Sequence, residues 1–183
     1  MQHGTPRAVA RLRAARVAPV FLLVLAGCSS SRTPFQGATT SGDEAAVHEA
    51  VIRFIARNYQ SSARAGTPRA WCLAVGRRSG LTYNAFMRGS DEPWNPSARL
   101  LSRLTDVEPR VLPVSECGQD AGLQERILET DEPAVLLVVS HPVWETAETA
   151  SVFVGMRENP SQEDRARCRL VRGPEGWSVR DCV

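Results

Sequence analysis

The sequence contains no lysine, and all 22 of its basic side chains are arginines. We interpret this bias as codon composition in a GC-rich genome rather than as a functional requirement. No Asp or Glu precedes residue 28, whereas the same segment holds four arginines. Subtracting these four leaves 18 arginines against 20 acidic residues, a formal charge of −2. A domain so close to neutrality is predicted to have no general electrostatic attraction for nucleic acid or for anionic lipid.

Catalytic and cofactor motifs are also missing: the chain has no G-x-S-x-G, G-x-G-x-x-G, P-loop or H-E-x-x-H. Ser140 and His141 are adjacent, but neighbouring residues of a strand point to opposite faces and do not form a nucleophile and its base. His141 is expected to begin a turn, and His48 to form a surface ion pair with Glu44. The sequence therefore supports no catalysis, metal or cofactor, although an acid–base site built from scattered Asp, His and Tyr would leave no motif.

No apolar run is long enough to cross a bilayer. Residues 17–26 are apolar, but this stretch is about half of the ~20 residues that a transmembrane helix needs, and Pro19 interrupts it. Four arginines precede it and a cysteine follows it two residues later, at Cys28. Basic, apolar and small-residue regions in this order predict that residues 1–27 are a signal peptide.

The residues Leu25-Ala26-Gly27-Cys28 resemble the lipobox of bacterial lipoproteins, which is a branched aliphatic residue, two small residues and a cysteine. The resemblance implies cleavage before Cys28 and acylation of its thiol and new amine, with fatty acids such as palmitate holding the protein on the membrane. Ser29 is not the Asp that retains many such lipoproteins at the inner membrane. The resemblance therefore implies the cell envelope and, in a cell that has one, an outer membrane with the protein facing the periplasm.

The rest of the chain predicts a tether over 28–42 and a single disulfide-stabilised α+β domain over 43–183. Ser41 and Glu44 have capping-box spacing before a helix expected over 43–60, and a second helix is expected over 96–104. Turn residues separate later segments rich in Val, Leu and Phe, which predict strands at 71–75, 111–115, 134–140, 149–157, 165–172 and 177–183. We expect the two helices to pack on a curved antiparallel sheet of about five or six strands.

This order of elements resembles in outline the NTF2-like and cystatin-like folds, in which a curved antiparallel sheet wraps a helix. The region from Trp71-Cys72 through 113–117 to Cys168 and Trp177 also resembles exported bacterial proteins of no assigned activity. The first resemblance implies an alternative function, in which a small enzyme or ligand carrier has a pocket inside the curved sheet.

The cysteines are interpreted as disulfide partners. With Cys28 acylated, four cysteines remain, an even number that permits three pairings in an oxidising compartment. No C-x-x-C motif indicates a redox or metal site. The residues 174–176 favour a three-residue hairpin loop, which sets Gly173 opposite Trp177 and Cys168 opposite Cys182. The predicted disulfides are Cys168–Cys182 and, by elimination, Cys72–Cys117.

Two surfaces are candidates for binding. Residues 76–95 form a long irregular segment that combines aromatic anchors with cations, as recognition loops do. Its candidate partner-binding residues are Arg77, Arg78, Tyr83, Phe86, Arg88 and Trp94. The alternative is that the apolar members pack back onto the domain.

The second candidate is a row of arginines on one strand face. Arg165, Arg167 and Arg169 alternate along the chain and would suit a phosphate, a sugar acid or a lipid headgroup. The alternative is a solvated face of ion pairs with Glu163, Asp164 and Asp181. We predict an anchored, non-catalytic envelope lipoprotein whose domain binds a protein or small ligand and no nucleic acid, while a purely structural role stays open.

Overall fold

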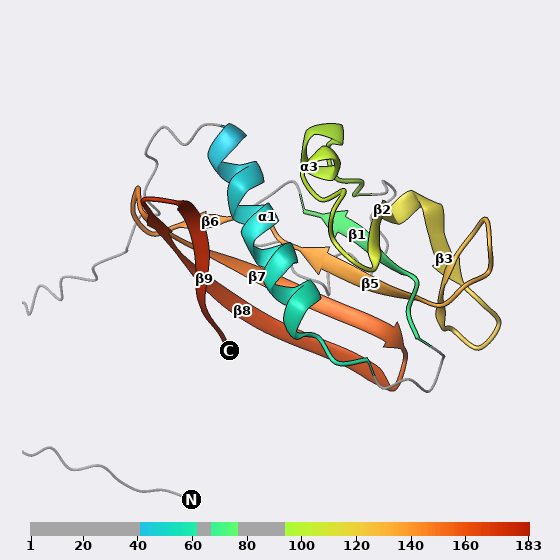
Figure 1. Cartoon of the computed structure of the whole chain (residues 1–183). Helices are drawn as coiled ribbons and strands as arrows, with labels where there is room; N and C mark the ends of the chain where they lie inside the picture. The colour runs from blue at the N-terminus through green and yellow to red at the C-terminus, as the bar shows by residue number, and fades with distance from the viewer. Residues whose placement is uncertain (1–40, 62–66, 77–93) are drawn as a thin grey trace, which may run out of the picture. The chain divides into compact units, whose positions relative to one another are not determined.

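The computed structural model describes residues 41–61, 67–76 and 94–183. They form an α+β domain in which two helices pack with a strongly curled mixed sheet (Figure 1). The helices are α1 (Ser41–Asn58) and α3 (Ala98–Ser102), with a 3-10 turn η1 at Val114–Glu116. The strands are β1 (Ala70–Val75), β2 (Arg110–Pro113), β3 (Cys117–Gln119), β4 (Glu125–Ile127), β5 (Ala134–Val139), β6 (Val143–Trp144), β7 (Thr149–Asn159), β8 (Gln162–Gly173) and β9 (Gly176–Cys182).

Both predicted helices are present. Helix α1 begins at Ser41, two residues before the expected start, and lies across one face of the sheet (Figure 1). It buries an apolar stripe of residues at helical spacing: Val47, Val51, Ile52 and Ile55. Helix α3 is shorter than expected because Ser97 caps it, its Oγ accepting a hydrogen bond from the Leu100 N–H at 3.2 Å.

The sheet has the order β2-β1-β5-β7-β8-β9, with β6 also paired to β7. Strand β1 is parallel to both β2 and β5, and all other pairs are antiparallel. The prediction of a purely antiparallel sheet is therefore wrong for this half. The physical reason lies in the long connections on either side of β2, which let the chain return to the same end of the sheet, as parallel neighbours require.

The two faces of the sheet carry separate apolar clusters. The face toward α1 holds Trp71 and Leu73 of β1 with Leu137 of β5, and it continues onto β7 and β8. The opposite face is covered by Trp94 and by the small β3–β4 hairpin, and its buried residues are Ala70, Cys72, Ala74, Trp94, Ile127, Ala134, Leu136 and Val138. Burial on both faces explains why all six residues of β5 are buried.

Both predicted disulfides are present, Cys72–Cys117 and Cys168–Cys182. The register that predicted the second is only partly right. Cys168 does lie opposite Cys182, but Gly173 pairs with Gly176 around a two-residue loop, not with Trp177. A bulge then absorbs one residue of β9, because Arg169 pairs with Asp181 and the next residue of β8 pairs with Val179. The two offsets cancel at the cysteines.

Candidate functional site

The predicted partner-binding loop falls mostly outside the described residues. The structure does not describe five of its candidate residues, Arg77, Arg78, Tyr83, Phe86 and Arg88, nor the proposed lipidation site Cys28. Trp94 is described, and its side chain is only 6% exposed in the cluster beneath the β3–β4 hairpin. Trp94 therefore follows the second alternative and packs into the domain.

The arginine row on β8 is neutralised by acidic neighbours. Arg165 pairs with Glu163, Arg169 Nε contacts Asp181 Oδ1 at 2.8 Å, and Arg167 reaches Glu145 at 3.4 Å. The Arg167 guanidinium also lies over the Phe153 ring, 5.4 Å from its centroid. These contacts match the ion-pair alternative, and they leave this face without the excess positive charge that a phosphate or sugar acid would need.

The histidines differ from expectation. His48 is only 2% exposed, and its Nε2–H donates to the Ser140 carbonyl at 3.0 Å. The Glu44 carboxylate instead contacts His141 Nδ1 at 3.1 Å. The expected surface pair of Glu44 with His48 is wrong because His48 lies on the face of α1 that packs against the sheet. Ser140 Oγ donates to the His141 carbonyl at 3.1 Å and accepts from the Phe153 N–H at 2.9 Å, so this hydroxyl is held by the backbone.

His48 predicts a pH-dependent stability. Burial lowers its pKa from 6.5, and the nearby His141 lowers it further, whereas the hydrogen bond to the Ser140 carbonyl and the charge of Glu44 oppose the shift. A histidine with a lowered folded-state pKa stabilises the domain above pH 6.5, and this contribution is lost as the pH falls through the folded pKa. As the pH falls from 6.5 toward the lower folded-state pKa of His48, we expect the free energy of unfolding to decrease with a limiting slope of about 1.4 kcal/mol per pH unit.

The measurement is urea unfolding at a series of pH values for the wild type and for His48→Gln, whose amide retains a donor for the Ser140 carbonyl. In the variant, the free energy of unfolding should decrease less as the pH falls, because the contribution of His48 is absent. Identical profiles for the two proteins between about pH 7 and about pH 5 would contradict the assignment.

The disulfides also bear on the compartment. Because the cytosol keeps thiols reduced, two disulfides indicate an extracellular or periplasmic protein. Within the described ranges, neither helix is long and apolar enough to span a membrane. In the same ranges, no three His, Cys, Asp or Glu side chains gather as ligands for a metal ion.

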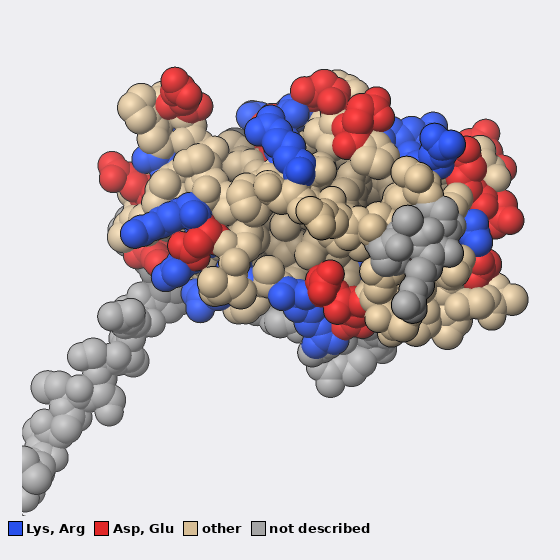
Figure 2. Space-filling model, turned by 60° about the horizontal axis from the view of Figure 1, so that its bottom comes forward, with Lys and Arg blue, Asp and Glu red and all other residues tan. Residues whose placement is uncertain are grey.

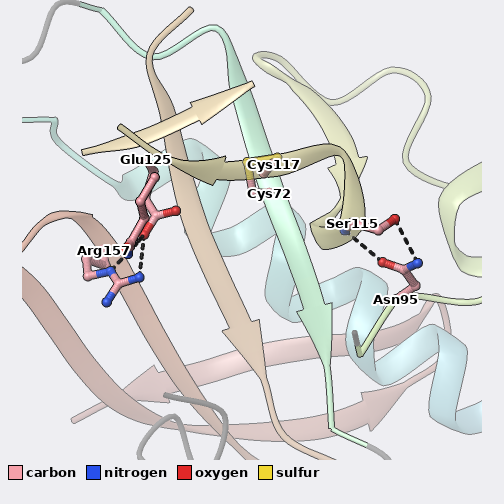
Figure 3. The surroundings of a disulfide bond; sticks show 7 residues. Cys72, Asn95, Ser115, Cys117, Glu125 and Arg157 are labelled. Carbon is pink, nitrogen blue, oxygen red and sulfur yellow. Dashed lines mark hydrogen bonds and ion pairs between the residues drawn. A yellow bond between two sulfur atoms is a disulfide. The ribbon is translucent and has the colours of Figure 1, made fainter. Parts of the chain in front are cut away.

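The β3–β4 hairpin is the best-defined candidate site. Among the described residues it pairs with itself as a two-stranded sheet, with one further bridge between Arg126 and Pro133, so other contacts also hold it on the main sheet. One is the Cys72–Cys117 disulfide from β1 to β3. Another is a buried ion pair, in which Arg157 Nε and Nη2 of β7 lie 2.8 and 2.5 Å from Glu125 Oε1 of β4 (Figure 3).

Hydrogen bonds fix the neighbouring segments. Asn95 and Ser115 form a reciprocal pair, with Asn95 Nδ2 donating to Ser115 Oγ at 2.9 Å and the Ser115 N–H donating to Asn95 Oδ1 at 3.0 Å (Figure 3). The Leu128 N–H donates to the Glu116 carbonyl at 2.9 Å. The Leu128 side chain lies over Gly118, because a Cβ added there would be 2.7 Å from Leu128 Cδ2. The residues after β4 are thus tied to η1 and β3.

A surface groove of ≈ 410 Å³ opens between these segments. Its volume is within the range of roughly 300–1,000 Å³ that ligand sites occupy. The lining combines apolar side chains with polar and charged ones: Leu112, Ile127 and Leu128 with Ser115, Arg110, Glu116 and Glu129. Leu128 borders this depression with 65% of its surface exposed.

This end of the domain is acidic. Residues 110–133 contain six Asp or Glu and two Arg, a formal charge of −4. Asp120 pairs with Arg126 at 3.0 Å and Glu125 pairs with Arg157. No ion pair is found for Arg110, Glu116 or Glu129 among the described residues. Figure 2 shows several acidic side chains, with arginines among them, along the right-hand edge, the edge that carries β3 in Figure 1.

Sequence reasoning missed the hairpin and therefore the groove. Its strands are only three residues long, too short to produce a visible alternation. The usable signal was the turn: Asp120 Oδ1 accepts from the N–H groups of Gly122 and Gln124, at 2.8 and 3.0 Å. An Asp followed two residues later by Gly is typical of such a turn.

Comparison of the chain with protein-family models, with curated proteins and with solved structures finds no match.

Proposed function

We propose that this protein is a lipid-anchored protein of the bacterial cell envelope whose disulfide-stabilised domain binds a partner near the membrane without catalysing a reaction. The observation that carries the proposal is the lipobox-like segment ending at Cys28, joined to a domain with two disulfides. An export signal, a lipid anchor and disulfides are all features of proteins that work outside the cytosol.

The tether sets where the partner is met. Residues 29–40, the part of the predicted tether that precedes α1, are small and polar with one Phe, a composition expected of a flexible linker. A flexible chain of this length has a root-mean-square span of about 20 Å. The domain is thus expected to work within a few nanometres of the membrane surface, where one acylated cysteine with more than one chain is enough for stable attachment.

The alternative, an enzyme or ligand carrier with a pocket inside the curved sheet, has weaker support. The sheet face toward α1 is packed with apolar side chains from the helix and from four strands, and in the described part of the chain Val51, Leu73 and Leu137 are each 0% exposed. Ser140, His48 and His141 are engaged in the contacts described above. Binding through the outer surface is therefore the better proposal.

The test is an in-cell crosslinking experiment with labelled palmitate as a second readout. We expect the wild type to take up label, to sediment with membranes and to form a discrete crosslinked species. Cys28→Ser should lose the label and the membrane attachment. Tyr83→Ala/Phe86→Ala should keep both but lose the crosslink if the segment 76–95 is the contact surface.

Trp94 is left unchanged in this design because replacing a buried indole would open a cavity and confuse binding with folding. Label retained by Cys28→Ser would contradict the anchor. An undiminished crosslink in the double variant would contradict the loop as the contact surface.

A further inference from the structure

We propose that the groove between β2, η1 and the residues after β4 is a docking site for an extended segment of a partner protein that carries an apolar side chain flanked by Arg or Lys. The inference rests on the proposed binding function and deepens it by naming the chemistry of a partner. The groove is defined by the lining residues given above and is independent of the segment 76–95.

The apolar part of the groove supplies the anchor point. Half-buried Leu112 of β2 and Leu128, with 65% of its surface exposed, supply its accessible apolar lining, while Ile127 of β4 is 2% exposed and lies beneath them. An apolar side chain placed here would remove part of the Leu128 surface from water, at about 25 cal/mol per Å². Isolated exposed leucines need no explanation, but one that borders a depression with an apolar lining marks a place where a partner gains affinity.

The walls are preorganised, which lowers the entropic cost of binding. The Cys72–Cys117 disulfide holds the start of β3 on β1, and the reciprocal Asn95–Ser115 hydrogen bonds hold η1. The bond from the Leu128 N–H to the Glu116 carbonyl joins the two walls. A partner therefore meets a formed surface instead of having to order one.

An extended segment suits the site because β2 is the outermost strand on its side of the described sheet. Its four residues pair with β1 alone, from Arg110 opposite Ala70 to Pro113 opposite Leu73. Backbone groups on the outer side of such a strand can pair with an added strand, while side chains of the added strand enter neighbouring pockets.

Charge decides the kind of segment. The groove has carboxylates at Glu116 and Glu129 against one cation at Arg110, and the surrounding residues 110–133, counted together with the Arg157 that pairs with Glu125, have a formal charge of −3. A segment with Arg or Lys beside its apolar anchor is attracted and oriented by this field. Phosphate-rich ligands such as nucleic acids and anionic lipids are repelled by it, so the occupant that fits is a basic stretch of protein.

The experiment measures binding of a labelled synthetic peptide, with a Val-Leu-Val centre flanked by arginines, to the full chain purified in detergent micelles. Two matched peptides replace the arginines with glutamates or the central leucine with serine. Fluorescence anisotropy should show the parent peptide binding at least about tenfold more tightly than either, and more weakly as salt is added.

Groove variants are compared with matched controls at the surface. Leu128→Ser should weaken parent-peptide binding about tenfold, whereas Leu123→Ser, at the 52% exposed leucine of the β3–β4 turn, should not change it. Glu129→Arg should weaken binding of the arginine peptide and strengthen binding of the glutamate peptide. Glu175→Arg, at the β8–β9 turn, should leave the preference between the two peptides unchanged. Urea unfolding checks that each variant is folded.

Equal affinity for the arginine and glutamate peptides, or unchanged binding by both Leu128→Ser and Glu129→Arg, would overturn the inference. These outcomes are separate from failure of the proposed function, because the peptide assay needs neither the lipid on Cys28 nor the residues of segment 76–95. A groove variant that binds no peptide but still crosslinks in cells would support the groove as the binding site of the basic peptide. It would also show that the partner crosslinked in cells contacts another surface.

Discussion

Glu125→Ala is expected to destabilise the domain by about 3–5 kcal/mol, because it leaves the Arg157 guanidinium buried without its partner. The Glu125 and Arg157 side chains are 5% and 10% exposed, so bulk solvent compensates little for the lost carboxylate. Gln119 Nε2, which donates to the same Glu125 oxygen at 3.0 Å, would lose its acceptor as well. Urea unfolding of the wild type and the variant measures the effect.

Asp181→Ala is the matched control. It removes the acidic partner of Arg169, but that pair is 57% and 31% exposed and should contribute less than about 1 kcal/mol. A loss of under about 1 kcal/mol for Glu125→Ala would contradict the buried-pair argument.

The pair need not be favourable as a whole. Burial raises the pKa of Glu125, and the hydrogen bonds from Gln119 and Arg157 oppose that shift, which means that the site disfavours the charged carboxylate. Replacing both members with apolar residues of similar size, Glu125→Leu/Arg157→Met, is therefore expected to recover most of the stability lost by Glu125→Ala.

Removing the first disulfide with Cys72→Ala/Cys117→Ala is expected to lower the free energy of unfolding by about 4 kcal/mol on the chain-entropy model. The same model predicts a smaller loss, about 3 kcal/mol, for Cys168→Ala/Cys182→Ala. The cysteines of the two bridges are separated by 45 and 14 residues, and the longer loop gives the greater constraint on the unfolded chain. Unfolding in urea without reductant provides both values.

The order of the two losses has a structural reason besides loop length. Strands β8 and β9 keep a ladder of backbone pairs when their disulfide is removed. Within the described residues the β3–β4 hairpin has no such ladder to the main sheet and keeps the bridge at Arg126, the buried pair at Glu125 and the packing of Ile127. Cys72→Ala/Cys117→Ala should therefore also weaken binding of the arginine peptide at the groove. A greater loss of stability for Cys168→Ala/Cys182→Ala than for Cys72→Ala/Cys117→Ala would contradict this explanation.

Local patterns predicted the parts of the fold that local physics controls. Helical spacing located α1, and strand composition located β5, β7, β8 and β9, because an amphipathic stripe or an apolar run is a property of contiguous residues. The pairing of Cys168 with Cys182 was reached from a hairpin register in which the loop was one residue too long and the bulge was absent. The pairing survived because the two deviations compensate each other.

Long-range placement was beyond the same reasoning. The burial of His48 and of Trp94 depends on which surface another element presents, and their neighbours in sequence carry no record of it. The parallel pairing of β1 with β2 and β5 depends on the route of long connections. The candidate groove combines residues from β2, η1 and β4, which only the folded chain brings together.

The amino-acid sequence by itself determined the predicted export signal with its candidate anchor at Cys28, the α+β class and the Cys168–Cys182 pair, because local composition, periodicity or a single hairpin register encodes each; Cys72–Cys117 then followed by elimination. Only the tertiary structure decided the mixed sheet, the buried Arg157–Glu125 pair and the acidic, leucine-lined groove. Their interactions join residues far apart in the chain, and their energies come from burial and from charges held close together in a dry interior.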